Sequence, residues 1–461
     1  MRRERDSLGE VLVEEEKFWG ASTQRALNNF YIGNEKIPLE IIYALAIIKK
    51  ASAIANYKLN QLAKEKKDLI VFAADEILAK KYDEHFPLHI WQTGSGTSTN
   101  MNVNEVICNI ASFKLNKILG SKDPIHPNDD VNMSQSTNDT FPSALNISAY
   151  LLIKNRLLDS LEQLKTGFDE KVIEFNEIIK VGRTHLMDAI PMTLGQEFSA
   201  FSSTVSEGIE NIKSSLEKLA FLPLGATAVG TGLNTHKKFS KVVIEEISSL
   251  TKEKFHKADN FFHSLSFADP VCSMSSALKN LASSLFKIAN DLSLLSSGPR
   301  CGIGEIILPP IEPGSSIMPG KINPSMCEAM KMVSMQVVSN DSMISSSNSL
   351  GNFQLNVFRP LQGYALIQSV NLLADMSDMF LKHCLKGLKA NLIKIKEHLD
   401  KNLMVATVLN KSIGYENASK IVLKAYQEDI TLKQAAKELN LVDEKKFDEI
   451  VNLKNLLSPH D

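Results

Sequence analysis

The sequence feature that most constrains the fold is an apolar repeat between residues 272 and 299. Apolar side chains recur there at alternating spacings of three and four, at Met274, Leu278, Leu281, Leu285, Ile288, Leu292 and Leu295, and Gly298-Pro299 follows them. Such spacing places side chains along one face of an α-helix, and a Gly-Pro pair ends a helix. The segment is therefore predicted to be a long helix with an apolar seam.

Similar repeats predict further long helices in the segments 158–179, 194–219, 326–337 and 366–380. Together they indicate a bundle of long helices in the middle of the chain. A helix of about 30 residues is about 45 Å long, more than one domain covers. We therefore expect its exposed apolar flanks to pack against identical chains, so that most seam residues have a structural role in a homo-oligomer.

The predicted fold class is all-α, and at roughly 150 residues per domain the 461 residues suggest about three domains. The expected parts are a mostly helical N-terminal domain (1–133), the central long-helix bundle (134–387) and a small, charged, helical C-terminal domain (388–461). Within the first part, residues 39–66 are predicted to form one helix.

Charge and cysteine usage limit the classes of function. The 51 basic and 53 acidic residues leave a formal net charge of -2, so no long-range field attracts nucleic acid or an anionic membrane. The five cysteines are scattered without a C-x-x-C pair, which favours a reduced, cytoplasmic protein without a metal site. No apolar segment follows the N-terminal arginines and no run approaches about 18 apolar residues, so we expect a soluble, unprocessed chain.

Four polar segments interrupt the apolar patterns and carry the candidate chemistry. They read TGSGTSTNMN (93–102), HPNDDVNMSQSTND (126–139), GRTHLMDA (182–189) and GSSIMPGKINP (314–324). Ser, Thr and Asn are also preferred at helix N-caps and turns, so any one of these segments alone fits an ordinary capped loop equally well.

The last segment indicates an anion site. Asn323 and Pro324 fit the N-cap and first position of a helix, and Lys321 lies two residues before the cap. This lysine and the helix N-terminus could together hold an anion. A phosphate-binding P-loop does not fit, because the Gly314–Gly320 spacing is one residue too long and Ile322 follows the lysine.

The string GSSIMPGKIN resembles the signature G-S-S-x-M-P-x-K-x-N of the fumarase/aspartase superfamily. The other three segments follow in the order and spacing of that superfamily, and the similarity runs from about Asp6 to Leu457. The strings WQTGSGT, GRTHL, TAVGTGLNT, SGPRCGIGE and GNFQLNVFRP resemble the class II fumarases. Aspartate ammonia-lyases usually read GRTQL, without His185, and argininosuccinate and adenylosuccinate lyases lack HPNDDVN and WQTGSGT.

The resemblance implies a homotetrameric fumarate hydratase that interconverts fumarate and (S)-malate without metal or cofactor. The implied intermediate is a dianionic aci-carboxylate, which needs many fixed hydrogen-bond donors. Two alternatives stay open, an aspartate ammonia-lyase and a catalytically inactive structural member of the fold. Ser315, His185, Lys321 and Glu328 are all present, which argues against the inactive member.

The resemblance also assigns roles to individual residues. It implies that Ser315 is the base that takes the carbon-bound proton, and that His185, paired with Glu328, serves the water or hydroxyl group. The residues implied to surround the two substrate carboxylates are Ser95, Gly96, Thr97, Ser136, Thr137, Asn138, Thr184, Ser316, Lys321, Ile322 and Asn323. Each site is implied to collect its loops from three subunits.

A second, non-catalytic dicarboxylate site is implied at His126, Asn128 and Asp129, with Asp130 beside them. Family members often have a basic residue three positions before the histidine, where this chain has Asp123. The alternative interpretation is a turn whose polar side chains cap neighbouring backbone groups.

Overall fold

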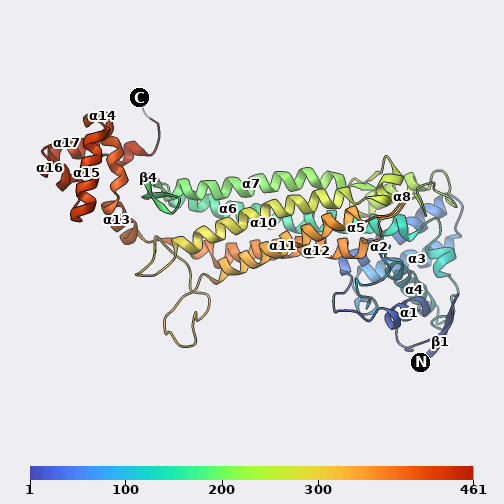
Figure 1. The fold of residues 1–461 in the computed structure, drawn as a ribbon. Helices are drawn as coiled ribbons and strands as arrows, with labels where there is room; N and C mark the ends of the chain where they lie inside the picture. The colour runs from blue at the N-terminus through green and yellow to red at the C-terminus, as the bar shows by residue number, and fades with distance from the viewer. Residues whose placement is uncertain (460–461) are drawn as a thin grey trace. The chain divides into compact units, whose positions relative to one another are not determined.

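The computed structural model describes residues 1–459, and helices dominate it (Figure 1). The helices are α1 (Ala21–Asn29), α2 (Leu39–Lys58), α3 (Lys64–Leu78), α4 (Thr97–Lys114), α5 (Thr137–Leu152), α6 (Leu158–Glu174), α7 (Leu194–Leu219), α8 (Phe239–Thr251), α9 (Phe261–Ser266), α10 (Asp269–Leu295), α11 (Ser325–Ser349), α12 (Arg359–His383), α13 (Leu392–Lys401), α14 (Asn410–Ile413), α15 (Tyr415–Glu428), α16 (Leu432–Glu438) and α17 (Glu444–Ile450).

Short two-stranded sheets accompany the helices. The antiparallel pairs are β1 (Arg2–Asp6) with β2 (Gly9–Val13), β3 (Ile179–Thr184) with β4 (Met187–Thr193), and β7 (Ile306–Ile307) with β8 (Lys389–Ala390). The parallel pair is β5 (Phe221–Leu222) with β6 (His256–Lys257). The all-α prediction is confirmed at the level of a mostly helical fold, with these small sheets as an addition.

The chain divides into two compact units. Unit 1 contains residues 1–159, 208–283 and 334–374, and unit 2 contains residues 160–207, 284–333 and the chain from residue 375 onward. The long helices α7, α10, α11 and α12 contribute residues to both units. The three-part division made from the sequence stays a prediction.

Unit 1 is built around α2, which packs against α3, α5 and α8. A Cβ added at Gly208 of α7 would lie 2.7 Å from Leu281 Cδ1 of α10, so glycine permits the close approach of these helices. The buried amide of Asn340 on α11 donates to Ala365 O at 3.2 Å and to Ser369 Oγ at 3.0 Å on α12. Polar and apolar contacts therefore both fix the bundle segments of this unit.

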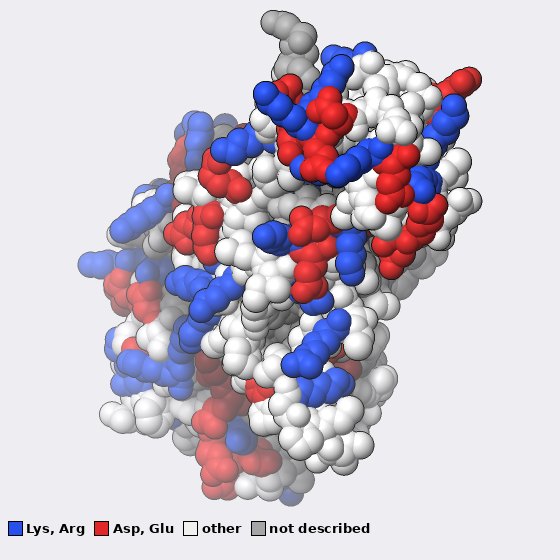
Figure 2. Space-filling view, turned by 90° about the vertical axis from the view of Figure 1, so that its left-hand side faces the viewer, with Lys and Arg blue, Asp and Glu red and all other residues white. Residues whose placement is uncertain are grey.

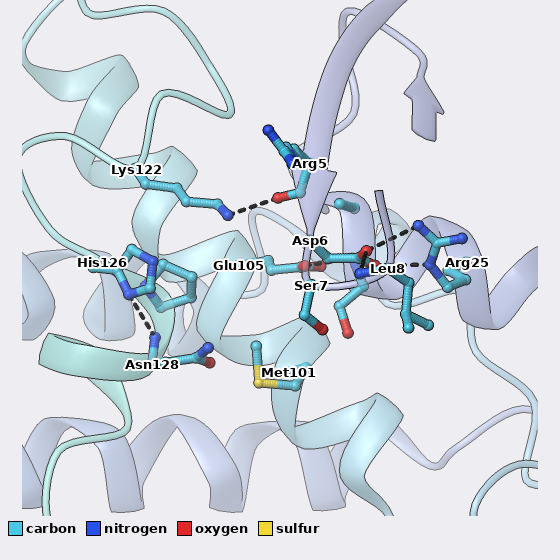
Figure 3. A pocket seen from close by; sticks show the side chains of 13 residues that line it. Arg5, Asp6, Ser7, Leu8, Arg25, Met101, Glu105, Lys122, His126 and Asn128 are labelled. Atoms are coloured by element: carbon cyan, nitrogen blue, oxygen red, sulfur yellow. Dashed lines mark hydrogen bonds and ion pairs between the residues drawn. The ribbon is translucent and has the colours of Figure 1, made fainter. Parts of the chain in front are cut away.

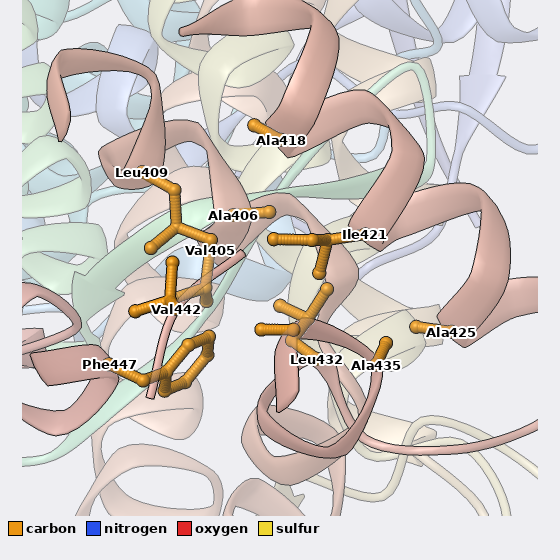
Figure 4. Packing of buried hydrophobic residues seen from close by; sticks show 11 residues of the cluster. Val405, Ala406, Leu409, Ala418, Ile421, Ala425, Leu432, Ala435, Val442 and Phe447 are labelled. Carbon is orange, nitrogen blue, oxygen red and sulfur yellow. The ribbon is translucent and has the colours of Figure 1, made fainter. Parts of the chain in front are cut away.

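Unit 2 contains two hydrophobic groups. The rings of Phe168, Phe198 and Phe201 pack with centroids 5.4–6.4 Å apart and join α6 to α7. A separate hydrophobic cluster lies near the C-terminus, and most of its members come from α15, α16, α17 and the segment Leu403–Leu409 (Figure 4). Its buried members are Val405, Ala406, Leu409, Ala418, Ile421, Ala425, Leu432, Ala435, Ala436, Val442 and Phe447.

The apolar repeats predicted the long helices α7, α10, α11 and α12, and the structure confirms them. Two of the other predicted boundaries were wrong. The helix expected over 39–66 ends at Lys58, because Asn60 takes a left-handed conformation (φ 58°), and a new helix starts at Lys64. The helix expected over 158–179 ends at Glu174, and Ile179 instead begins β3, where it pairs with Thr193.

Charges of both signs are interspersed over the face drawn in Figure 2, and no large area of one sign stands out there. This pattern agrees with the near-zero net charge. Within residues 1–459, no helix has the length and apolar character that a membrane crossing requires.

Candidate active site

The first polar segment forms the start of α4. Ser95 Oγ and Thr97 Oγ1 are 2.9 Å apart, and the helix begins at Thr97. Gly96 between them has φ 83°, and an added Cβ would lie 2.3 Å from the ring of Phe141, so only glycine fits. The first amide groups of a helix have no partners within the helix. The helix start at Ser95, Gly96 and Thr97 is therefore of the kind that can bind an anion.

The second segment ends in the N-cap of α5. Ser136 Oγ accepts a hydrogen bond from Asn138 N at 3.3 Å, and Ser136 N donates to Asp139 Oδ1 at 3.0 Å, within a capping box. The Asn138 amide donates to Ala228 O at 2.8 Å. The candidates Ser136, Thr137 and Asn138 are thus fixed at a second helix N-terminus.

Hydrogen bonds join these two helix starts within unit 1. Asn100 Nδ2 of α4 donates to Thr137 Oγ1 at 3.0 Å and to Asn132 Oδ1 at 3.1 Å. Asp139 Oδ2 accepts from Gly225 N at 3.0 Å and Thr227 N at 2.8 Å, which attaches the loop that carries TAVGTGLNT. The structure therefore brings together six of the predicted substrate-binding residues.

The third segment is a β-hairpin, which the helical interpretation of the sequence did not foresee. Thr184 ends β3, and the turn residues His185 and Leu186 have φ of 57° and 63°. Side chains other than glycine rarely adopt this conformation, and such strain gathers at functional sites. His185 is exposed at the tip of the hairpin.

A buried charge cluster holds the base of this hairpin. Arg183 donates to Glu305 Oε1 at 2.8 Å, Lys180 lies 3.1 Å from Glu305 Oε2, and His398 Nδ1 lies 2.9 Å from Oε1. Burial opposes the charge on Glu305, but the hydrogen bond from Arg183 and the charge of Lys180 hold its pKa below the usual range. The hairpin that presents His185 is therefore anchored through ion pairs.

The fourth segment is a loop closed on itself. Gly314 N donates to Lys321 O at 3.0 Å, and Asn323 Nδ2 donates to Gly314 O at 2.7 Å. Ser315 Oγ accepts hydrogen bonds from Ile317 N at 3.2 Å and Met318 N at 3.0 Å. Two amide donors on one hydroxyl oxygen favour its deprotonated form.

The helix after this loop begins one residue later than predicted. The carbonyl of Pro324 accepts from Glu328 N at 3.0 Å, so Pro324 occupies the cap position and α11 starts at Ser325. The Asn323 side chain donates through Nδ2 to Gly314 O and so closes the loop. Lys321 is exposed, and no hydrogen bond or ion pair engages its ammonium group within residues 1–459.

Within residues 1–459, no hydrogen bond or ion pair joins the hairpin candidates Thr184 and His185 to the candidates of the fourth segment or α11. Glu328 lies in the first turn of α11 and is exposed, as are Thr184 and Ser316. Neither a hydrogen bond nor an ion pair joins Glu328 to His185 in the described part of the chain. The exposed apolar side chains around these candidates include Leu186, Met187, Ile317, Met318 and Ile322.

A pocket of about 650 Å³ in unit 1 is lined by two of the three residues predicted for the second site, whereas the third, Asp129, does not line it (Figure 3). His126 and Asn128 line it, together with the cations Arg5, Arg25 and Lys122. Lys122 Nζ donates to Arg5 O at 2.8 Å, which ties the N-terminal strand to the histidine loop. Sequence reasoning missed these cations, because only the fold brings residues 5 and 122 to one wall.

His126 also caps the π-helix η2 (Pro127–Val131). Its Nδ1 accepts from Asn128 N at 3.3 Å and Asp129 N at 3.2 Å. Asp129 projects into solvent, whereas Asp130 is buried and paired with Lys66 at 2.8 Å. His126 can therefore cap η2 and also line the pocket, so the two interpretations of this segment are compatible.

Comparisons with known proteins agree with this arrangement of motifs. A family model described as "Lyase" matches residues 9–339, and one described as "Fumarase C C-terminus" matches residues 405–458. The first match covers most of the chain and places it among the lyases of this fold.

Comparison with individual relatives assigns the chain to a narrower family within these lyases. The chain is 52% identical over 458 residues to a protein named fumarate hydratase class II from Bacillus anthracis, and 50% identical over 458 residues to one from Helicobacter pylori; each alignment covers 99% of both chains. The crystal structure of a class II fumarase from Schistosoma mansoni has a TM-score of 0.97 and 41% identity, with both chains fully covered.

The chain belongs to the class II fumarate hydratase family, whose members act on small dicarboxylates, and it is a lyase of the hydro-lyase type. The family resemblance drawn from the sequence is confirmed. Among residues 1–459, no group of three or more His, Cys, Asp or Glu side chains is arranged to hold a metal ion.

Proposed function

We propose that this chain catalyses the reversible hydration of fumarate to (S)-malate, with Ser315 as the base. The observation that carries the assignment is the position of Ser315 Oγ, which accepts two backbone amide hydrogens at 3.2 Å and 3.0 Å. These amides stabilise a serine alkoxide, which an isolated serine cannot form near neutral pH.

In the dehydration direction, the alkoxide of Ser315 removes a proton from the methylene carbon of malate. The electron pair moves into the adjacent carboxylate and gives the dianionic aci-carboxylate. That pair then returns to form the double bond as the C–O bond breaks, and the leaving hydroxyl takes a proton on the His185 side and departs as water. Fumarate and water are the products, and the hydration direction retraces these steps.

Fixed donors stabilise the charge that develops on the substrate. We assign this role to the hydroxyls and amides at the starts of α4 and α5, namely Ser95, Gly96, Thr97, Ser136, Thr137 and Asn138. From unit 2 we assign Thr184, Ser316, Lys321, Asn323 and the backbone of Ile322. Such donors act most strongly when they are held in place before the reaction, and the hydrogen bonds within both helix starts support that requirement.

We further propose that the site is completed by self-association into a homotetramer. His185 and Glu328 would then pair between chains, since no contact within the chain joins them. Two methionines on α11, Met332 and Met335, are 66% and 62% exposed, and Val338 continues their spacing. An apolar row of this kind on a long helix favours a partner helix.

We assign the protein to the cytoplasm. The support is that all five cysteines are free, which is usual in a reducing compartment.

The function is tested by the absorbance of the conjugated double bond. Purified protein should form fumarate from malate, should leave aspartate unchanged, and should keep its rate after treatment with a chelator. The physical reason is that the proposed steps use only side chains and backbone amides. Ammonia release from aspartate would favour the ammonia-lyase. The absence of a reaction with either substrate would favour the inactive member. Loss of the rate after treatment with a chelator would disprove the metal-free reaction.

We also propose that the pocket lined by His126 and Asn128 binds a second dicarboxylate. Arg5 and Lys122 line the same pocket and supply positive charge. Lys117 Nζ lies 2.5 Å from Asp123, so the acidic residue that replaces the usual cation is itself neutralised.

His126→Asn is expected to weaken this second binding event while changing malate turnover less than about twofold. Asparagine also caps helices, so η2 should persist, while the imidazole that lines the pocket is lost. Calorimetric titration with succinate should give two binding events per chain in the parent protein and one in the variant. A collapse of turnover would mean that the pocket belongs to the active site.

A further inference from the structure

Lys49 is a buried lysine without a carboxylate in hydrogen-bond contact. It lies on α2 with 0% of its surface exposed, and its Nζ donates to Asn132 Oδ1 at 2.9 Å and Gln135 Oε1 at 3.0 Å. Both acceptors are neutral amides. Burial of an ammonium group with neutral partners is costly, so its retention at this position calls for an explanation.

The charges around Lys49 do not compensate for this burial. Burial lowers the pKa of Lys49 to about 7, and Asp139 is the one charged group that opposes the shift. The Asp139 carboxylate is occupied by four other donors, from Ser136, Thr140, Gly225 and Thr227. Three other charged groups on elements packed against α2 are engaged elsewhere: Lys66 of α3 with Asp130 of η2, Glu246 of α8 with Lys58, and Glu105 of α4 with amides of residues 20–23.

A short chain of hydrogen bonds connects Lys49 to Thr137. This residue lies in the polar segment 126–139, which is called the substrate loop below. In its ammonium form the lysine can only donate, so it fixes Asn132 Oδ1 as an acceptor. Asn100 Nδ2 donates to the same oxygen at 3.1 Å and to Thr137 Oγ1 at 3.0 Å. Thr137 Oγ1 is thereby an acceptor from Asn100, and no described residue accepts its proton. The hydroxyl proton of Thr137 is therefore oriented for donation to a ligand.

We propose that Lys49 is a positioning residue that orients the donors of the substrate loop through Asn132 and Asn100. When a dicarboxylate dianion binds, the buried Lys49 takes up a proton and becomes fully charged. The inference rests on the proposed function, because it takes the dianion to lie at the start of α5. It adds a role for a residue that does not touch the substrate.

The physical basis is linkage between charge and binding. A pKa lowered by burial to about 7 would leave Lys49 partly neutral in the free protein near and above pH 7. A dianion in the same low-dielectric surroundings favours the ammonium form, so the bound state carries more protons than the free state. Binding must then weaken as the pH rises from about 7.5 to 8.5, by up to about tenfold per pH unit.

The test is calorimetric titration of the full-length parent protein with succinate, a saturated dicarboxylate that cannot be hydrated. Titrations at pH 7.5–8.5 in phosphate and in Tris, which differ in ionisation enthalpy, give the number of protons taken up. We expect net uptake of a substantial fraction of a proton per active site. We also expect KM for malate to rise over this range while kcat changes less.

Variants separate Lys49 from other groups that titrate. Lys49→Met should abolish the uptake, flatten the pH dependence of KM, and raise KM at pH 7 by roughly tenfold. Lys50→Met is the matched control, because the neighbouring Lys50 pairs with the half-exposed carboxylate of Asp75 at 2.5 Å. His185→Gln and His126→Asn should both retain the uptake, which excludes the two imidazoles as its source.

The outcomes distinguish this inference from the function on which it rests. Succinate binding without proton uptake in the parent protein overturns the role of Lys49 even if malate turnover is normal, and this measurement does not depend on folding of any variant. Uptake that persists in folded Lys49→Met protein also overturns it. Absence of both succinate binding and malate turnover would instead disprove the proposed dicarboxylate site.

Discussion

Ser315→Ala is expected to lower malate turnover by about 10²–10⁴-fold, the range typical for loss of a positioned base. The variant removes the oxygen atom that would take the carbon-bound proton. The fold should persist, because Ser315 Oγ accepts from two amides of its own loop, and the loop is also closed by the bond between Asn323 and Gly314. The loss should fall on kcat more than on KM.

Steady-state kinetics with malate, alongside circular dichroism and size-exclusion chromatography, measure this effect. Ser199→Ala is the matched control, because Ser199 is an exposed serine of α7 that bonds only to Gln196 O of the same helix. The control should keep its turnover. Near-normal turnover in folded Ser315→Ala protein would mean that another group is the base.

Much of the fold could be predicted from the sequence because the apolar repeats are long. In α7 the repeat from Leu194 to Leu219 coincides with the helix itself. The predicted helix ends were wrong where a local change in backbone conformation or pairing ended the helix. Asn60 terminates α2 through a left-handed residue, and Ile179 enters a hairpin because its backbone pairs with Thr193. Periodicity alone cannot detect either event.

Candidate site residues could be proposed from the sequence where they are contiguous, and their roles stay predictions. The motifs around Ser136 and Ser315 could be identified as short strings, and the structure adds the hydrogen bonds that explain them. Lys49, Arg5 and Lys122 could not be found in this way, because their surroundings come from segments far apart in the chain. The pair Lys49-Lys50 within a mostly apolar stretch of α2 was the only sequence signal for Lys49.

The second large effect concerns assembly. We expect inactive Ser315→Ala and His185→Gln chains to regain activity when they are unfolded and refolded together. If each site takes Ser315 and His185 from different chains, random assembly of equal amounts should leave both residues intact in roughly a quarter of the sites. The absence of a contact between His185 and Glu328 within the described chain is consistent with such sharing, as is the exposed apolar row on α11.

Co-refolding is also the most direct test of the account as a whole, because it examines the base, the histidine and the shared site in one measurement. The two variants are mixed in denaturant at equal concentration, refolded, isolated as tetramers by size-exclusion chromatography and assayed for fumarate formation from malate. Each variant refolded alone is the control. The account predicts about one quarter of the activity of refolded parent protein in the mixture. Mixed tetramers as inactive as the separate variants would contradict the shared site and require each chain to build its own.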